Sequence, residues 1–200
     1  MNLDTIQTIL RQHVPDTAPS ARTRHHAAVA LVLFPGSDRA LSTLFIKRAE
    51  HPLDPWSGHM ALPGGWKDPT DTTLEAAARR ETAEETGVPI AQEALLGRLD
   101  DVETDRLRQI DLSVASFVYY LEELPPLTPN REVSLILQAP LDALLDPQRH
   151  AVYHFPPDPL HRAWPCIHYD GQIIWGLTYR VLQNFFLLTG DKLPAENELP

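Results

Sequence analysis

The longest unbroken run of apolar residues, residues 27–34, limits what this chain can fold into. Its eight residues are too few for a membrane-spanning helix, which takes roughly 17–25 residues. The run is partly β-branched and is closed by Pro35-Gly36, a pattern typical of a strand that ends in a turn. We therefore expect a globular fold that contains a sheet, and no membrane span.

Further strand-like and helix-like segments follow. Residues 42–47 come directly after the turn and are expected to pair with the first strand as a hairpin, and residues 166–175 predict a second hairpin around Asp170-Gly171. The other expected strands are residues 95–99, 112–120 and 133–137, and the expected helices are residues 74–86, 142–145 and 178–188. No strand–helix–strand unit repeats, so the sequence predicts an α+β fold with a mixed sheet sandwiched between helices.

Residues 1–24 predict a helix and a linker ahead of the main domain. Apolar residues recur at helical spacing from Leu3 to Leu10, and Pro15 and Pro19 end the pattern. We expect this helix to dock on the domain and to carry no chemistry. The domain itself is expected over residues 25–190, with a C-terminal tail over residues 191–200. Residues 49–71, rich in proline, glycine and aspartate, predict a long functional loop.

The charge balance restricts the partners of the chain. It has 17 Lys and Arg residues against 27 Asp and Glu residues, a formal net charge of −10, and no basic run longer than two. A chain this acidic repels nucleic-acid polymers, and an anionic small molecule would need a divalent cation between itself and the carboxylates. A single cysteine suits a reducing compartment, and no apolar leader pattern opens the chain, so we expect a cytoplasmic protein.

Three glutamates share one face of the helix that is expected to end at Gly87. Glu81, Glu84 and Glu85 have i, i+3, i+4 spacing, which places their carboxylates within about one helical turn. Like charges this close are destabilising without a cation, and hard oxygen ligands favour Mg²⁺ or Mn²⁺. Arg80 can reach Glu84 at i+4. From the spacing alone, a solvated acidic face is an equally good interpretation.

A turn with two glycines precedes this helix. Pro63-Gly64-Gly65 lets a backbone carbonyl approach a metal or a phosphate, because neither glycine has a Cβ atom. An ordinary turn would also explain the glycines. A glycine turn that leads into an acidic helix still makes a better pocket than either feature alone.

Residues 65–88, with the core Arg80-Glu81-Thr82-Ala83-Glu84-Glu85, resemble the box motif of the Nudix hydrolases. The resemblance implies the Nudix fold, a mixed sheet between helices in an α/β/α arrangement. It also implies metal-dependent hydrolysis of a nucleoside diphosphate linked to another moiety. Mg²⁺ or Mn²⁺ would then be the cofactor. The implied ligands are Glu81, Glu84, Glu85 and a backbone carbonyl of Gly64 or Gly65, with Arg80 orienting the glutamates.

The sequence departs from the family pattern at one point. The family has a glutamate eight residues before the arginine, and that position is Thr72 here. Asp71 lies six residues after Gly65, as the glutamate would, but one inserted residue then separates it from Arg80. The sequence leaves open whether Asp71 takes over the structural role of that glutamate.

Segments outside the box are similar to a narrower group, the coenzyme A diphosphatases. They are Arg48-Ala49, residues 58–65, and the later segments 130–133, 140–141 and 174–178. The match is imperfect, because the second arginine of that group's motif falls near Leu53 and Gly58 is displaced by one position. The similarity favours coenzyme A or a derivative as the substrate. The alternatives are ADP-ribose, a nucleotide sugar or another nucleotide, and a catalytically inactive Nudix-fold protein that binds ligands.

Other residues complete the expected site. Nudix enzymes often use a carboxylate from outside the helix, which makes Glu132 a candidate base or ligand; a surface glutamate is the alternative. Arg48, Trp56 and Gly64 are assigned to substrate binding, with Trp56 either stacking on an adenine or plugging its loop. The expected partner is a small nucleotide, and a homodimer is compatible with the sequence. A second acidic loop is expected to be solvated surface: Asp101, Glu103 and Asp105.

Overall fold

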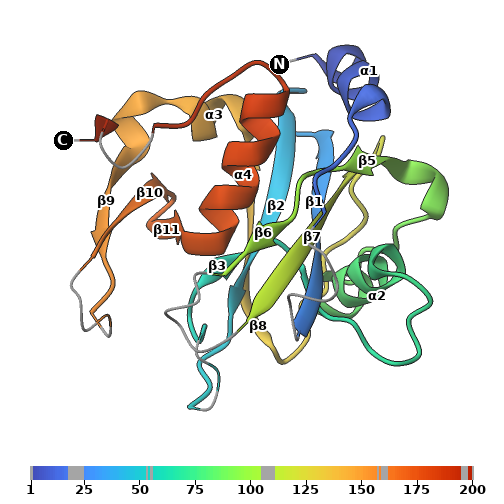
Figure 1. Ribbon diagram of the computed structural model, residues 1–200, viewed down its shortest axis with the longest axis horizontal. Coiled ribbons are helices and arrows are strands. Elements are labelled where there is room, and N and C mark those ends of the chain that lie inside the picture. The colour runs from blue at the N-terminus through green and yellow to red at the C-terminus, as the bar shows by residue number, and fades with distance from the viewer. Residues whose placement is uncertain are drawn as a thin grey trace.

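The computed structural model describes residues 2–17, 25–52, 54, 56–104, 111–156, 158, 162–194 and 198–199. Figure 1 shows a central mixed sheet, helices packed around it, and a smaller second sheet at one side. The α+β class and the α/β/α layering predicted from the sequence are confirmed.

The central sheet has eight strands. β1 (His25–Pro35) and β7 (Leu112–Tyr120) run parallel at its middle. β2 (Leu41–Arg48) pairs antiparallel with β1, as the predicted hairpin requires, and also with β8 (Val133–Pro140). The remaining strands are short: β3 (Met60–Ala61), β4 (Gly64–Trp66), β5 (Leu95–Arg98) and β6 (Val102–Glu103). One parallel pair among antiparallel pairs makes the sheet mixed.

β1 is buried on both faces because helices cover each side of the sheet. Its alternate residues, such as Ala30 and Val32, pack toward α2 (Leu74–Thr86), whereas Leu31 and Leu33 join the core beneath α4 (Gly176–Leu188). This two-sided burial explains why the strand is an unbroken apolar run rather than an alternating one. Two further helices contribute to the core beneath α4: α1 (Leu3–Gln12) and α3 (Leu141–Leu145).

A three-stranded antiparallel sheet packs beside α4. Its strands are β9 (His150–His154), β10 (Ala163–Tyr169) and β11 (Gln172–Trp175). The β10–β11 hairpin turns at Asp170 and Gly171, as predicted from the sequence. β9, which the sequence analysis did not predict, completes this sheet. Among the described residues there are also single turns of 3₁₀ helix, such as η1 (Gln92–Ala94) and η3 (Pro147–Arg149).

The segment expected as one long loop, residues 49–71, contains β3 and β4, so that prediction was wrong in part. β4 pairs with β1, placing Gly64 opposite Val29. Gly64 has a φ of 144°, and a Cβ atom there would overlap the Ala28 carbonyl oxygen and lie 2.6 Å from the Val29 Cα atom. The missing side chain therefore lets the chain approach β1 closely just before α2 begins.

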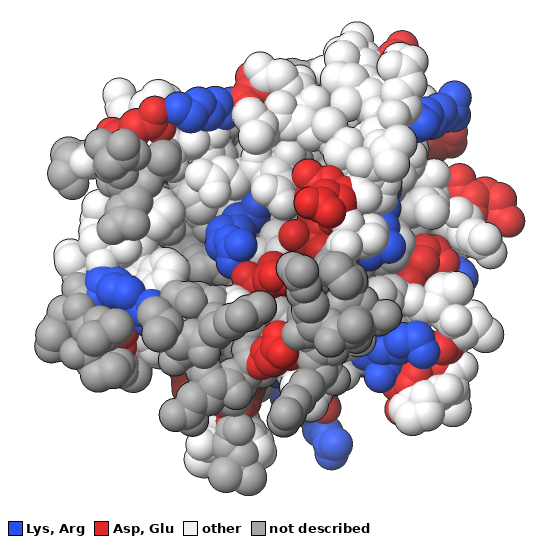
Figure 2. All heavy atoms as spheres, in the orientation of Figure 1, with Lys and Arg blue, Asp and Glu red and all other residues white. Residues whose placement is uncertain are grey.

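The surface of the molecule carries both signs of charge. On the face drawn in Figure 2, the described Lys and Arg side chains stand as separate groups among Asp and Glu side chains. They do not form a continuous basic track of the kind that binds a nucleic-acid backbone. Within the described ranges, every helix is too short or too polar to span a bilayer.

Candidate active site

α2 carries the three glutamates, and residues at its ends determine where it begins and stops. Thr73 is the N-cap residue, and its Oγ1 accepts a hydrogen bond of 3.0 Å from the Ala76 N–H. The helix ends at Gly87, as predicted from the sequence. Ala77 and Ala78 form a fully buried face against β1. These small residues bring the helix close to the sheet and set the depth of the glutamates beside it.

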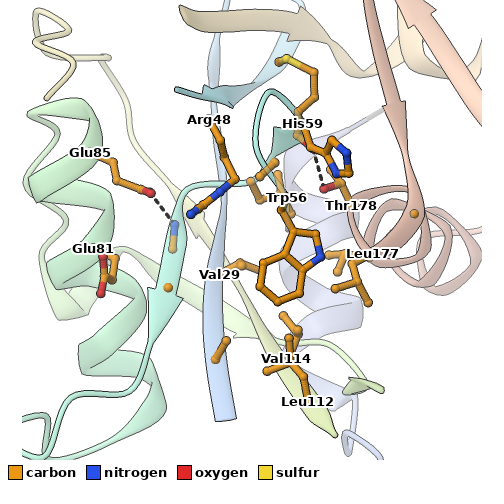
Figure 3. Close-up of a pocket in the computed structure, with 18 of the residues that line it drawn as sticks. Val29, Arg48, Trp56, His59, Glu81, Glu85, Leu112, Val114, Leu177 and Thr178 are labelled. Carbon is orange, nitrogen blue, oxygen red and sulfur yellow. Dashed lines mark hydrogen bonds between the residues drawn. The ribbon is translucent and has the colours of Figure 1, made fainter. Parts of the chain in front are cut away.

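Glu85 is buried, with 3% of its surface exposed. Its Oε2 accepts a hydrogen bond of 2.8 Å from the Gly64 N–H, as Figure 3 shows. Burial raises the pKa of the Glu85 carboxyl to about 8, because the charged form loses its water, and the neighbouring charges of Glu81 and Glu132 add to the rise. The Gly64 N–H and the Arg48 guanidinium oppose it. A carboxylate in this position gains from a nearby cation.

Glu81 lies against the glycine turn. A Cβ atom built on Gly65 would be 2.8 Å from the Glu81 Cδ atom, so any other residue there would displace the carboxyl group. Burial is also the main cause of the raised pKa of Glu81, and Arg80 acts against it. Gly65 thus creates the space in which the Glu81 carboxyl lies.

Arg80 connects the acidic residues around α2. Its Nε and Nη2 donate to the two carboxylate oxygens of Asp71 at 3.0 and 2.9 Å. Its Nη1 donates to Glu81 at 2.9 Å and to Glu84 at 3.2 Å, the i+4 contact predicted from the sequence. The Arg80 hydrogen bonds are the main cause of the lowered pKa of Asp71. Asp71 therefore forms the bidentate arginine pair despite the inserted residue, which answers the question the sequence left open.

A cavity of about 260 Å³ opens beside these groups. Figure 3 shows Glu81, Glu85 and Arg48 on one side and apolar side chains around Trp56 on the other. Glu132 also lines the cavity. Its carbonyl oxygen accepts a hydrogen bond of 2.8 Å from the Ala49 N–H, which ties the end of β2 to the start of β8. Most of the predicted site residues line this one cavity: Arg48, Trp56, Gly64, Gly65, Glu81, Glu85 and Glu132.

Asp54 is a residue of the site that the sequence analysis missed. Its Oδ2 accepts a hydrogen bond of 2.7 Å from Arg48 Nε, and its Oδ1 accepts one of 3.0 Å from the Trp56 N–H. One carboxylate thus holds both an arginine and a tryptophan of the cavity wall. An acidic residue between those two positions was the available signal.

The family model of the NUDIX domain matches residues 24–158, which include the whole glutamate and arginine arrangement. The chain belongs to the Nudix family. It is 30% identical over 164 residues to the uncharacterized Nudix hydrolase NudL of Escherichia fergusonii, covering 82% of this chain and 83% of that protein. It is 32% identical over 167 residues to an uncharacterized protein of Schizosaccharomyces pombe, covering 74% of this chain but 51% of that protein's length.

The fold likeness extends over the complete chain. The crystal structure of a MutT/nudix family protein from Enterococcus faecalis matches with a TM-score of 0.60 and 21% identity, covering 100% of this chain and 73% of that one. This likeness supports the Nudix fold, and the family model together with the similarity to NudL identifies the protein as a Nudix hydrolase.

The glutamates of this Nudix hydrolase differ in how they face the cavity. Glu84 is 54% exposed at its side chain and lies outside the cavity lining, where Arg80 contacts it. Among the described residues, no three acidic, histidine or cysteine side chains converge as a ready-made metal site. Mg²⁺, however, is usually bound by one or two carboxylates together with waters and substrate phosphates. Glu81 and Glu85, which line the same cavity, fit such a shared ion.

The acidic loop beyond η1 is only partly the solvated surface that we expected. The Asp101 side chain is 6% exposed and forms an ion pair of 2.7 Å with Arg98. The prediction was therefore wrong for Asp101, because a partner three residues away on the neighbouring strand stabilises the buried carboxylate. Glu103 is exposed, and Asp105 lies outside the described residues.

Replacing Asp71 by asparagine should lower the free energy of unfolding by about 1–3 kcal/mol, because Arg80 loses its bidentate partner in a mostly buried position. For a chain of this length that is about 2–4 °C in Tm per kcal/mol. Since the pKa of Asp71 is lowered on folding, its contribution is fully present above the ordinary aspartate pKa of about 3.9 and is lost as the pH falls from there through the lowered folded pKa. Thermal denaturation at pH 7 and pH 3 measures both effects. A Tm at pH 7 equal to that of the exposed-site control Glu122→Gln would contradict the structural role of Asp71.

Proposed function

We propose that this Nudix hydrolase cleaves the diphosphate of coenzyme A or one of its derivatives, with Mg²⁺ or Mn²⁺ bound by Glu81, Glu84 and Glu85. The observation that supports this substrate is spatial. The segments similar to coenzyme A diphosphatases are far apart in the sequence, yet Arg48, residues 59–62, Glu132 and residues 175–178 all line the same cavity as Glu81 and Glu85. A set of separate motifs that gathers around one ligand space is expected when they share a ligand.

The glutamates of α2, Gly65 and Arg80 have distinct roles in this proposal. A divalent cation at the glutamates would neutralise the diphosphate and lower the pKa of the attacking water. The backbone carbonyl of Gly65 would be a further ligand of the cation. Arg80 offsets the mutual repulsion of the glutamates and fixes the Glu81 carboxyl through its 2.9 Å contact.

Arg48 and Glu132 lie on the remaining wall. Arg48, oriented by Asp54, binds a phosphate oxygen of the substrate through its guanidinium. Glu132 lines the cavity together with Glu81 and Glu85, and its charge raises the pKa of both. It accepts the proton of the attacking water. We assign this catalytic unit to residues 25–190, and α1 to a docking role, because Ile6 and Leu10 are buried in the core beneath α4.

A hydrolysis screen with Mg²⁺ and with Mn²⁺ tests the proposal. The substrates are coenzyme A, ADP-ribose, dinucleoside polyphosphates and oxidised nucleotides, with products identified by mass spectrometry. We expect coenzyme A to be cleaved at its diphosphate with the highest kcat/KM of the set. A higher kcat/KM for ADP-ribose would replace coenzyme A as substrate, and no hydrolysis of any compound would indicate an inactive ligand-binding protein.

A further inference from the structure

We propose that two copies of this chain associate through β8, which pairs antiparallel with the β8 strand of the second copy. The inference goes beyond the proposed function and does not depend on it, because it concerns an edge of the sheet and not the cavity. β8 pairs with β2 on one side, and among the described residues no strand pairs with its other side. Such an edge presents a row of backbone N–H and C=O groups to which a further strand can bind.

The two edges of the central sheet differ in how they are protected. The opposite edge is β5, which has four residues, a register shift between Leu95 and Gly97, and α1 packed against it. A Cβ atom on Gly97 would lie 2.9 Å from the Leu10 Cβ atom, and Figure 1 shows α1 next to β5. Short strands, bulges and covering elements are the usual protections of a sheet edge, and β5 has all three.

β8 has few of these protections. It pairs with β2 in regular register from Leu135 to Pro140, and its register shift lies at the other end, between Leu135 and Val133. Six residues in register make a strand of ordinary length. Residues 133–141 contain no charged side chain, although a lysine is a common means of blocking an edge. The one proline, Pro140, stands at the end of the strand, where α3 begins. The edge therefore remains open to a further strand.

β8 is held rigidly in the fold and still exposes part of its surface. Leu137 and Ala139 are buried in the core beneath α4. Leu135, in contrast, is 38% exposed and is one of four large apolar side chains that are exposed within the described ranges. Ser134 and Gln138 are exposed as well. A partner strand would thus meet an uncharged, partly apolar edge that is already ordered, which lowers the entropy cost of binding.

The charges around β8 favour a second copy of the chain as the partner. Each copy has a net charge of −10, so two copies repel each other unless they meet at an uncharged surface. Arg131 precedes β8 and Asp142 follows it, and both are exposed. Glu132, the other charged residue next to the strand, lines the cavity.

Arg131 and Asp142 lie at opposite ends of the strand. The eight residues of β8 separate the two ends by about 26 Å within one copy. Antiparallel pairing about a two-fold axis brings the Arg131 end of each copy to the Asp142 end of the other. Opposite charges therefore meet at both ends of the uncharged strand, which makes the edge complementary to itself.

Sedimentation equilibrium over a wide range of protein concentrations tests the proposal. We expect the mass to approach twice the 22.5 kDa of the chain reversibly. Leu135→Lys should raise the dimer dissociation constant at least about tenfold, because it places a charge on the pairing edge. The matched control Leu187→Lys changes a leucine that is 70% exposed on α4, and it should leave the dissociation constant unchanged. Each variant adds one positive charge, so a difference between them does not come from overall repulsion.

The charges at the ends of β8 give a second test, which depends on the antiparallel arrangement. Arg131→Glu places like charges together at both ends and should raise the dissociation constant by about 2- to 30-fold, as expected for two exposed ion pairs in each dimer. Adding Asp142→Lys to this variant reverses both charges and should recover most of the lost affinity. A double variant that associates no better than Arg131→Glu would overturn the inference.

Two further outcomes of sedimentation would overturn it. One is a wild type that stays monomeric at every concentration, and the other is a dimer that Leu135→Lys weakens no more than Leu187→Lys does. Circular dichroism and the Tm show whether each variant is folded, and Gln138→Lys, at another exposed position of β8, replaces Leu135→Lys if that variant unfolds. Amide hydrogen exchange within residues 135–140 should be slower in the dimer than in the monomer, and equal exchange would place the interface elsewhere.

Discussion

Replacing Glu85 by glutamine should lower kcat at least about 100-fold, because glutamine keeps the size of the side chain but brings no negative charge to the cation. The carboxamide oxygen can still accept the 2.8 Å hydrogen bond from Gly64, so the local backbone is retained. Glu84→Gln should have an effect of the same order if Glu84 leaves Arg80 to bind metal. Steady-state kinetics at saturating Mg²⁺, with the best substrate of the screen, measure both.

The stability of the Glu85→Gln variant distinguishes a catalytic role of Glu85 from a structural one. Its Tm without metal should be higher than that of the wild type, because a buried carboxylate that is repelled by Glu81 and Glu132 has been removed. The folded pKa of about 8 lies above the unfolded value, so folding binds a proton. The wild type therefore loses stability as the pH rises from about 4.3 through the folded pKa, and the advantage of the variant should grow over the same interval.

Thermal denaturation in the presence of a chelator, at pH 5 and at pH 9, checks this expectation. Glu122→Gln removes one exposed carboxylate and should change the Tm little at either pH. A Glu85→Gln protein that melts far below the wild type would show that Glu85 holds the glycine turn in place through Gly64, and its lost activity would then have a structural cause.

The sequence predicted the parts of the fold that are built from long, uniform patterns. β1 and β7 were predicted because each is a long apolar strand, and α4 because Val181, Leu182, Phe185 and Phe186 repeat at helical spacing. β4 was missed because its own residues do not favour a strand. Glycines have low strand propensity, and Gly64 becomes part of a strand only because β1 accepts a backbone without a side chain.

The site shows the same division between local pattern and tertiary contact. The i, i+3, i+4 spacing of the glutamates predicted their common face, and the 3.2 Å contact of Arg80 with Glu84 follows from helix geometry. The different environments of Glu85 and Glu84, one buried and one exposed, depend on which part of the helix the glycine turn covers. The sequence shows an acidic residue between Arg48 and Trp56, but the contacts of Asp54 with both depend on a loop that folds back onto Arg48.

Divalent metal should stabilise the folded protein through the glutamates of α2. An ion that binds only the folded chain adds RT ln(1 + [L]/Kd), about 2.7 kcal/mol at a hundredfold excess over Kd, or about 5–11 °C in Tm for a protein of this size. The unfolded chain binds far more weakly, since the glutamates come together only on the helix. Thermal denaturation over a range of Mg²⁺ and Mn²⁺ concentrations gives the size of the effect.

The decisive comparison is between two triple variants that remove the same charge. Replacing Glu81, Glu84 and Glu85 by glutamine should abolish the stabilisation by metal. Replacing three exposed glutamates by glutamine should leave the stabilisation by metal intact: Glu103, Glu122 and Glu123. Asp101 is unsuitable as a control because it forms an ion pair with Arg98. An equal Tm increase in both variants would mean that the cation only screens a chain of net charge −10, since screening depends on total charge and not on position. The glutamates of α2 would then not be the metal-binding site, and the mechanism proposed for this Nudix hydrolase would lose its basis.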